Sequence, residues 1–245
     1  MSHHYQFYVH PENVGKGAFF LSGEEFHHAV KVLRKKVGDS LAAVDGLGNC
    51  YEGRIEDISS LQLKVRIDSK TRNTGEPELF LTLAQAVPKG SHFDWVVEKG
   101  TELGVSAFQP ILTKYSLIDP SSRIERWRHK ALSAMKQCGR SRCPEILPPV
   151  EFVRILEEAF NIPAFIAHES FQGNFEADFY ALLKSSARAI VFIGPEGGFN
   201  QNEIELAVEN GVHPISLGSR RLRSETAGIV AAVKILSASG DLGKL

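Results

Sequence analysis

The hydrophobic pattern of the chain changes once, and this change constrains the fold more than any other feature. Before a polar stretch at residues 68–77, short apolar runs are separated by Gly, Asp, Asn and Ser, which is typical of half-buried strands. After that stretch, apolar strands alternate with longer amphipathic helices, which is typical of an α/β domain with a mostly parallel sheet. We therefore expect two domains, at residues 1–72 and 73–245.

The spacing of apolar residues also predicts the individual elements. In the first domain it predicts a helix at 23–33, with Ser22 as N-cap and Glu25 three residues on, and strands at 7–9, 41–44, 50–55 and 61–67. Residues 68–77 carry turn formers without either period and predict a linker. In the second domain it predicts strands at 79–86, 107–112, 164–167, 189–193 and 214–217. The helical segments expected there are 93–103, 124–138, 152–160, 179–183, 201–210 and 226–238.

Composition sets the broad class of the protein. The chain is 43% hydrophobic and 23% charged, which is close to the average for globular proteins. Its first residues lack the basic and apolar regions of a signal peptide, and no apolar run reaches the roughly 18 residues of a spanning helix. Cys50, Cys138 and Cys143 match neither a disulfide framework nor a zinc site. We expect a cytoplasmic protein with reduced thiols, no metal and no membrane segment.

Charge is unevenly distributed along the chain. The net charge is −1, although a partner with many phosphates normally requires a basic surface. Residues 121–143 nevertheless hold seven basic residues against one acid, Glu125. Smaller basic clusters lie at residues 31–36 and 220–223. Solvated faces explain any single cluster, but three clusters together favour an RNA-facing surface.

Two loops at the ends of predicted strands stand out, because open α/β sheets bind ligands at the carboxyl ends of their strands. Residues 194–198, Gly-Pro-Glu-Gly-Gly, would let backbone amides approach a ligand closely, yet their spacing fits neither a dinucleotide-binding loop nor a P-loop. Residues 216–227 combine three arginines, an N-capping serine and Glu225. Each loop also has a purely structural explanation. Residues 194–198 could simply form a tight turn, and Glu225 could simply stabilise the helix dipole at the start of a helix.

Together with other motifs, these loops resemble the RsmE family, the ribosomal RNA small-subunit uridine N3-methyltransferases of the SPOUT superfamily. The matching residues span nearly the whole chain: His28 with Val32-Leu33-Arg34, Asp45-Gly46, Lys89-Gly90, Lys99 with Glu102-Leu103-Gly104-Val105, Gln137-Cys138-Gly139-Arg140, Pro144-Glu145-Ile146, Gly194–Gly198, and Leu217-Gly218 with Leu222-Arg223 and Glu225-Thr226-Ala227. Three places depart from the family pattern: Gln6 and Lys136 replace a basic and an acidic residue, and residues 91–95 are less basic.

The resemblance implies an N-terminal PUA-like β-barrel for RNA and a C-terminal SPOUT α/β domain with a trefoil knot within about residues 163–230. It also implies a homodimer with the active site near the subunit interface. The cofactor implied is S-adenosyl-L-methionine, held by backbone groups of three loops. The residues expected to bind it are His168, Glu169, Ile193, Gly194, Pro195, Glu196, Gly197, Gly198, Ser216, Leu217, Gly218, Leu222, Thr226 and Ala227.

The activity implied is S-adenosylmethionine-dependent N3-methylation of a specific uridine in 16S ribosomal RNA, as naked RNA or within the small ribosomal subunit. Since N3 lies on the Watson–Crick edge, the target base has to be unpaired or flipped out. Arg223 is expected to contact the target or stabilise its negative charge, and Glu225 to orient it or help remove the proton. The residues expected to bind RNA are His28, Lys31, Arg34, Lys89, Arg140 and Arg142.

Two alternative functions stay open at this point. The chain could be a ribosome-assembly factor that binds RNA without catalysis, which predicts RNA binding without cofactor binding. The glycines at 194–198 and the arginine at 223 argue against this alternative, because a chain without a cofactor has no need of both. The chain could also be a SPOUT methyltransferase that modifies transfer RNA or a ribose hydroxyl, but the matched N-terminal segment favours ribosomal RNA.

Overall fold

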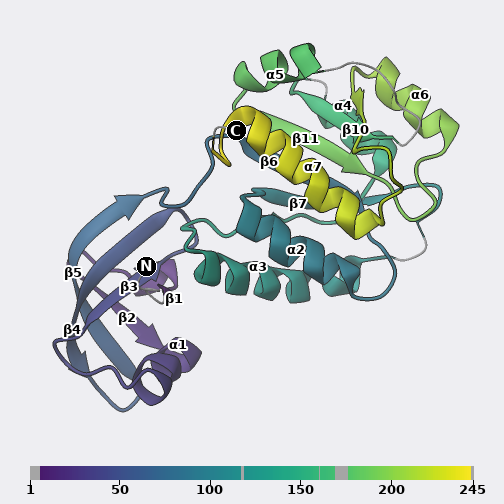
Figure 1. Cartoon of the computed structure of the whole chain (residues 1–245). Helices are drawn as coiled ribbons and strands as arrows, with labels where there is room; N and C mark the ends of the chain where they lie inside the picture. The colour runs from purple at the N-terminus through teal and green to yellow at the C-terminus, as the bar shows by residue number, and fades with distance from the viewer. Residues whose placement is uncertain (1–5, 117–118, 160, 169–175, 244–245) are drawn as a thin grey trace. The chain divides into compact units, whose positions relative to one another are not determined.

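The structure is a computed structural model that describes residues 6–116, 119–159, 161–168 and 176–243 (Figure 1). It divides into two compact units, the first made of Met1–Glu76 and Leu132–Cys143 and the second of Pro77–Ala131 and Pro144–Leu245. The boundary expected at residue 72 lies close to the first passage between the units. The sequence did not reveal that the second half of helix α3 (Ile124–Cys138) groups with the first unit.

The first unit is a five-stranded sheet in the order β1-β3-β4-β5-β2, in which β1 and β3 are parallel and the other pairs antiparallel. Its strands are β1 (Gln6–Tyr8), β2 (Ala18–Ser22), β3 (Ser40–Val44), β4 (Asn49–Ile58) and β5 (Gln62–Arg72). Alternate residues point into one core that includes Phe7, Phe19, Leu41, Tyr51, Ile55 and Leu63. The predicted β-rich unit is confirmed; β2 and the short 3-10 turn η1 (Pro11–Asn13) were not predicted.

The helix of the first unit is shorter than predicted. An α-helical turn, α1 (Gly23–His27), runs directly into one turn of π-helix, η2 (His28–Val32). The wider turn breaks the predicted 3.6-residue spacing, and Leu33 is 39% exposed where the pattern placed it in the core. Ser22 makes no side-chain capping hydrogen bond, and Glu25 accepts one from the backbone N–H of Tyr8 at 3.3 Å, so the predicted capping box is wrong.

The predicted linker is partly strand. Residues 68–72 extend β5, where they pair with β4 although their side chains are mostly exposed. Backbone hydrogen bonds to β4 hold this segment, so its lack of an apolar pattern was a misleading signal. Residues 73–76 make the connection to the second unit.

The second unit is built on a parallel sheet in the order β12-β10-β11-β6-β7-β8, with β9 also paired to β7. Its central strands are almost fully buried, as the continuous apolar runs predicted. The strands are β6 (Phe80–Ala86), β7 (Ala107–Leu112), β8 (Glu145–Ile146), β9 (Val150–Glu151), β10 (Ala164–Ala167), β11 (Arg188–Ile193) and β12 (His213–Ile215).

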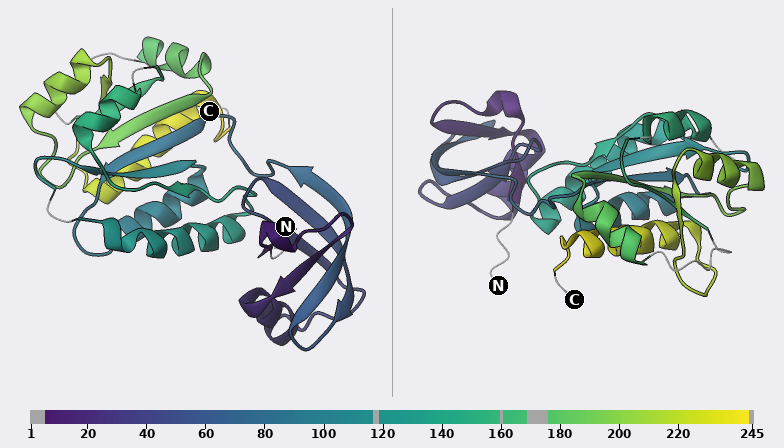
Figure 2. Two further views of the ribbon diagram at one scale, coloured as in Figure 1. Left: turned by 180° about the vertical axis from the view of Figure 1, so that it is seen from behind. Right: turned by 90° about the horizontal axis from the view of Figure 1, so that it is seen from above.

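Helices cover both faces of this sheet (Figures 1 and 2). Helices α2 (His92–Leu103) and α7 (Ser224–Ser239) lie side by side on one face, where α5 (Glu176–Lys184) also packs on α7. Helices α4 (Phe152–Ala159) and α6 (Gln201–Glu209) share the core of the other face with Ile166 and Phe192. The predicted α/β architecture is confirmed, and a capping box of Asn200 and Glu203 begins α6.

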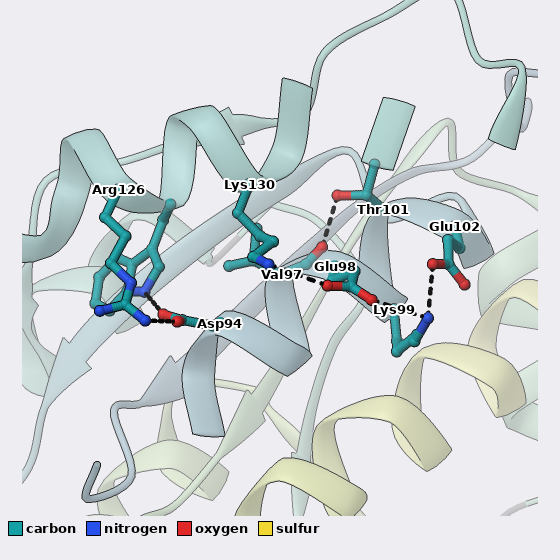
Figure 3. A network of polar contacts seen from close by, with 9 residues as sticks. Asp94, Val97, Glu98, Lys99, Thr101, Glu102, Arg126 and Lys130 are labelled. Atoms are coloured by element: carbon teal, nitrogen blue, oxygen red, sulfur yellow. Dashed lines mark hydrogen bonds and ion pairs between the residues drawn. The ribbon is translucent and has the colours of Figure 1, made fainter. Parts of the chain in front are cut away.

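Helix α2 is joined to the first half of α3 by charged side chains (Figure 3). Asp94 accepts from the guanidinium of Arg126 and, at 3.0 Å, from the indole N–H of Trp127. One turn further along, Glu98 pairs with Lys130 and Lys99. Arg126 and Lys130, two of the basic residues in the cluster at 121–143, are therefore paired with acids of α2.

Among the described helices, none is long and apolar enough to span a bilayer. The trefoil knot expected within residues 163–230 stays a prediction.

Candidate functional site

A cavity of about 550 Å³ opens at the carboxyl edge of the parallel sheet. Three loops line it: the residues after β10, those after β11, and those between β12 and α7. His92, at the start of α2, completes the lining. All these segments follow parallel strands, whose carboxyl ends meet at one edge, so distant parts of the sequence converge there.

Most of the predicted cofactor residues line this cavity. Those that do are His168, Ile193, Gly194, Pro195, Glu196, Gly197, Gly198, Leu217, Gly218, Leu222 and Ala227, together with the predicted catalytic residues Arg223 and Glu225. Ser216 and Thr226 do not line it, and Glu169 lies outside the described residues. The lining also includes Phe199, Arg220 and Arg221, which had not been assigned to the cofactor.

The loop after β11 is shaped for close backbone approach. A Cβ atom on Gly194 would lie 3.0 Å from the carbonyl carbon of Gly198, which is too close for a real side chain without movement of the loop. Gly198 has a φ of 72°, in the left-handed region that favours glycine. The side chain of Glu196 accepts from the backbone N–H of Lys89 at 3.0 Å, which ties this loop to the segment before α2.

The start of α7 is held against the same loop by buried polar groups. Gln85, at the end of β6, donates from Nε2 to the carbonyl and hydroxyl oxygens of Ser224, and the Ser224 hydroxyl donates to the carbonyl oxygen of Gly194 at 2.8 Å. Arg223, not Ser224, occupies the N-cap position and makes no side-chain cap, so the expected N-capping serine is wrong. Its hydroxyl links β6 to the loop after β11 instead. Gln85 was not among the predicted site residues, although a polar residue near the end of a buried strand is a usable signal.

Ser216 does not line the cavity, but it stabilises the loop between β12 and α7. Its hydroxyl accepts from the backbone N–H of Gly218 at 3.2 Å, and Lys234 of α7 donates to its carbonyl oxygen at 3.0 Å. Gly218, with a φ of 114°, adopts a backbone conformation that other residues rarely reach. Ser216 therefore fixes the position of Gly218 at the cavity.

The predicted RNA-binding residues fall into three groups. Lys31, Arg34, Lys89 and Arg142 are exposed. His28 is half-buried and meets the edge of the Phe7 ring, with the ring centroids 6.0 Å apart. Arg140 is only 3% exposed, and its guanidinium donates twice to Glu76, at 3.1 and 2.8 Å. The RNA-binding role of Arg140 stays a prediction, and it would require a phosphate to break this buried ion pair.

The basic cluster at residues 121–143 is largely neutralised within each unit. Five of its seven cations pair with acids: Arg126 with Asp94, Arg128 with Glu125, Lys130 with Glu98, Lys136 with Glu25, and Arg140 with Glu76. Four of these acids lie far away in the sequence, so the local count of charges overstated the basic surface. The departure at Lys136 is explained by its pairing with Glu25, and Gln6 is buried beside Cys50.

No group of three or more His, Cys, Asp or Glu residues that could hold a metal occurs among the described residues.

Comparisons with known proteins match both units. Residues 75–236 match the family model of the RNA methyltransferase domain, and residues 21–68 match that of the RNA methyltransferase PUA domain. A relative from Synechocystis sp., ribosomal RNA small subunit methyltransferase E, is 34% identical over 235 residues, which cover 94% of this chain and 77% of the relative. The chain belongs to the ribosomal RNA small subunit methyltransferase E family.

Other members of the methyltransferase E family agree with this assignment. The Bacillus subtilis member is 31% identical over 224 residues, covering 87% of each chain. The crystal structure of the Neisseria gonorrhoeae member bound to S-adenosyl methionine has a TM-score of 0.80 and 28% identity, over 96% of this chain and 97% of that one. The similarity therefore extends over both units.

Proposed function

We propose that the protein catalyses S-adenosylmethionine-dependent N3-methylation of a specific uridine in 16S ribosomal RNA of the small subunit. The observation that carries this proposal is the convergence of the three loops on one glycine-lined cavity, in a chain of this family. Its volume lies within the range of about 300–1,000 Å³ that is usual for small-molecule sites.

The cavity fits the proposed cofactor in size and chemistry. Leu217, Leu222 and Ile193 offer apolar surface for an adenine ring, and the backbone around Gly194 and Gly218 offers polar groups for its edge. A side chain at Gly194 would press against the backbone of Gly198, which would lie 3.0 Å from the new Cβ. When bound, S-adenosyl-L-methionine supplies a methyl group on a positively charged sulfur. No metal is required for this transfer.

Arg223 and Glu225 are the residues proposed to act on the target uridine. Both line the cavity, and Arg223 lies at the N-terminus of α7, where the helix dipole also favours negative charge. Uracil becomes negatively charged as N3 loses its proton, so a guanidinium at this position stabilises the reacting form. Glu225 orients the target or assists removal of the proton.

The exposed cations Lys31 and Arg34 in the first unit and Lys89 in the second are proposed to bind the RNA backbone, with Arg142 as a further contact. RNA with a single-stranded or flipped target suits this assignment, because N3 is hidden in a base pair. Charge reversal at Lys31 and Arg34 should weaken RNA binding and flatten its dependence on salt.

We further propose that the protein is a cytoplasmic homodimer, as the family resemblance implies. Trp95 on α2 and Val233 on α7 are exposed apolar side chains on the two helices that border the cavity, which supports an interface there. Light scattering of the purified protein tests the dimer, and Trp95→Glu should produce monomers if α2 forms the interface.

Nucleoside mass spectrometry of ribosomal RNA tests the proposed activity. Small-subunit RNA from cells that lack this protein should contain no N3-methyluridine, and the purified protein with S-adenosylmethionine should restore it. Unchanged N3-methyluridine in the deletion strain would refute the proposal. RNA binding without calorimetric binding of S-adenosylmethionine would indicate the non-catalytic assembly factor instead.

A further inference from the structure

An imidazole and a carboxylate face each other inside the cavity. Nδ1 of His92 lies 3.6 Å from Oε1 of Glu225, and both residues line the cavity. Glu225 is mostly buried, with 14% of its side chain exposed, whereas His92 is 53% exposed. They sit at the first turns of α2 and α7, two helices that pack together, so the backbone holds the pair in place.

We propose that His92 is the base that takes the proton from the target nitrogen, and that Glu225 orients it. This inference rests on the proposed function. In the reaction the N3–H bond of uridine breaks, its electron pair stays on N3, and the proton moves to Nε2 of His92. N3 then forms a bond to the methyl carbon as the carbon–sulfur bond breaks with its electron pair left on sulfur. His92 returns the proton to water.

The geometry assigns different tasks to the two residues. An imidazole whose Nδ1–H donates to a carboxylate presents the lone pair of Nε2 on its opposite side, ready to accept a proton. The present separation of 3.6 Å is longer than a hydrogen bond and would shorten in the complex with substrate. The same carboxylate stabilises the imidazolium that forms.

Imidazole is also the better base for this proton. The ordinary pKa of histidine, about 6.5, lies much closer to neutral pH than the value of about 4.3 for glutamate. A general base is most effective when its pKa lies near the working pH, because it is then both deprotonated and strong enough to accept. In general, a carboxylate is therefore a weaker acceptor than an imidazole for a weakly acidic N–H proton.

Charged groups on neighbouring elements affect the pair in opposite ways. Arg220, Arg221 and Arg223 line the cavity from the loop before α7, and they disfavour an imidazolium while favouring an anionic base. Glu225 on α7 and Glu196 after β11 favour the imidazolium, although Glu196 is engaged by the backbone of Lys89. His168 faces the cavity from the end of β10. On α2 itself, Asp94 is engaged by α3.

Single-turnover methylation of small-subunit RNA across pH tests the role of His92. The wild-type rate should rise with pH, because the base must be deprotonated to accept the proton. His92→Gln should lower the rate by about 10²–10⁴-fold and remove this rise, while calorimetry shows unchanged affinity for S-adenosylmethionine. His129→Gln, on the exposed face of α3, is the matched control and should behave as the wild type. A His92→Gln enzyme with the wild-type rate and pH profile would overturn the proposal.

A second measurement tests the pair without catalysis. Nitrogen NMR of the His92 ring should show the tautomer protonated at Nδ1 in the wild type, and Glu225→Gln should remove this preference because the anionic partner is lost. An unchanged preference for the Nδ1 tautomer in Glu225→Gln would overturn the pairing. Absence of N3-methyluridine from reactions of the wild-type enzyme would instead refute the proposed function, and the NMR result would distinguish the two failures.

Discussion

The side-chain amide of Gln85 lies 2.9 Å from the carbonyl oxygen and 3.1 Å from the hydroxyl oxygen of Ser224, and it donates to both. Gln85 is fully buried at the carboxyl end of β6, and Ser224 begins α7. Because the Ser224 hydroxyl donates onward to Gly194, one chain of hydrogen bonds joins the centre of the sheet, the last helix and the loop after β11. These buried hydrogen bonds fix the position of the loop after β11.

Ser224→Ala should weaken binding of S-adenosylmethionine and lower stability. The substitution removes the bond to Gly194 and leaves buried polar atoms unpartnered, which costs about 1–3 kcal/mol. Calorimetry and urea denaturation measure the two effects. Ser185→Ala, which removes an exposed hydroxyl at the end of α5, serves as the control. Wild-type affinity in Ser224→Ala would show that this hydrogen bond does not position the loop.

Gly194→Ala should reduce cofactor affinity at least tenfold with a modest effect on stability, because its Cβ would press against the backbone of Gly198. Gly211→Ala is the matched control, because it should affect stability and not cofactor affinity. Its φ of 78° strains any side chain, at a cost of about 1–2 kcal/mol, but nothing lies within 4 Å of the new Cβ. It should therefore lose stability and keep its affinity. Equal cofactor affinity in both variants would contradict the tight packing of the Gly194 loop.

Glu76→Ala should be among the most destabilising substitutions in the first unit. One carboxylate oxygen of Glu76 accepts from Arg140, and the other accepts from the backbone N–H groups of Ser141 and Arg142 at 2.8 and 2.7 Å. Removing one partner of a buried ion pair costs about 3–5 kcal/mol. Glu125→Ala, which breaks an exposed pair with Arg128, should cost at most about 1 kcal/mol. Similar urea midpoints for both variants would contradict this difference.

Asp45 should make the first unit sensitive to acid. Burial alone would raise the pKa of Asp45, but hydrogen bonds from Asn49, Leu47 and Tyr51 outweigh it and leave the pKa below its usual value. The stabilisation is complete above the unfolded-state pKa of about 3.9 and is lost as pH falls through the lower folded-state pKa. The stability advantage of the wild type over Asp45→Asn, measured in urea, should therefore shrink at acidic pH. A constant difference would contradict the shifted pKa.

Local signals in the sequence predicted local structure well. The helix predicted at 201–210 is observed as α6, and the capping box of Asn200 and Glu203 that begins it is local, because both partners lie within one turn. Helix α2 ends at Leu103, as predicted, and Gly104 follows it in the left-handed conformation. The loops at 194–198 and 216–227 come together because they follow parallel strands of one sheet, a relationship that the alternation of strands and helices already contained.

Long-range pairing could not be predicted in the same way. Arg140 appears as a free cation in the sequence, and its partner Glu76 lies 64 residues away. The hydroxyl of Ser224 reaches Gly194, 30 residues earlier, when local reasoning gave it a helix cap. His92 received no role from the sequence, because only the tertiary structure places Glu225 of α7 beside it. In each case the deciding contact depends on tertiary structure.

The internal pairing of the cations at residues 121–143 has a consequence for how the protein moves among cellular RNAs. For the five paired cations, a phosphate has to compete with a carboxylate for the side chain, so each such contact gains less net attraction. We therefore expect these cations to add little to the binding of RNA that lacks the target structure. Recognition then depends on a folded RNA that places its backbone against the few remaining exposed cations. The small number of such cations is what makes the binding selective.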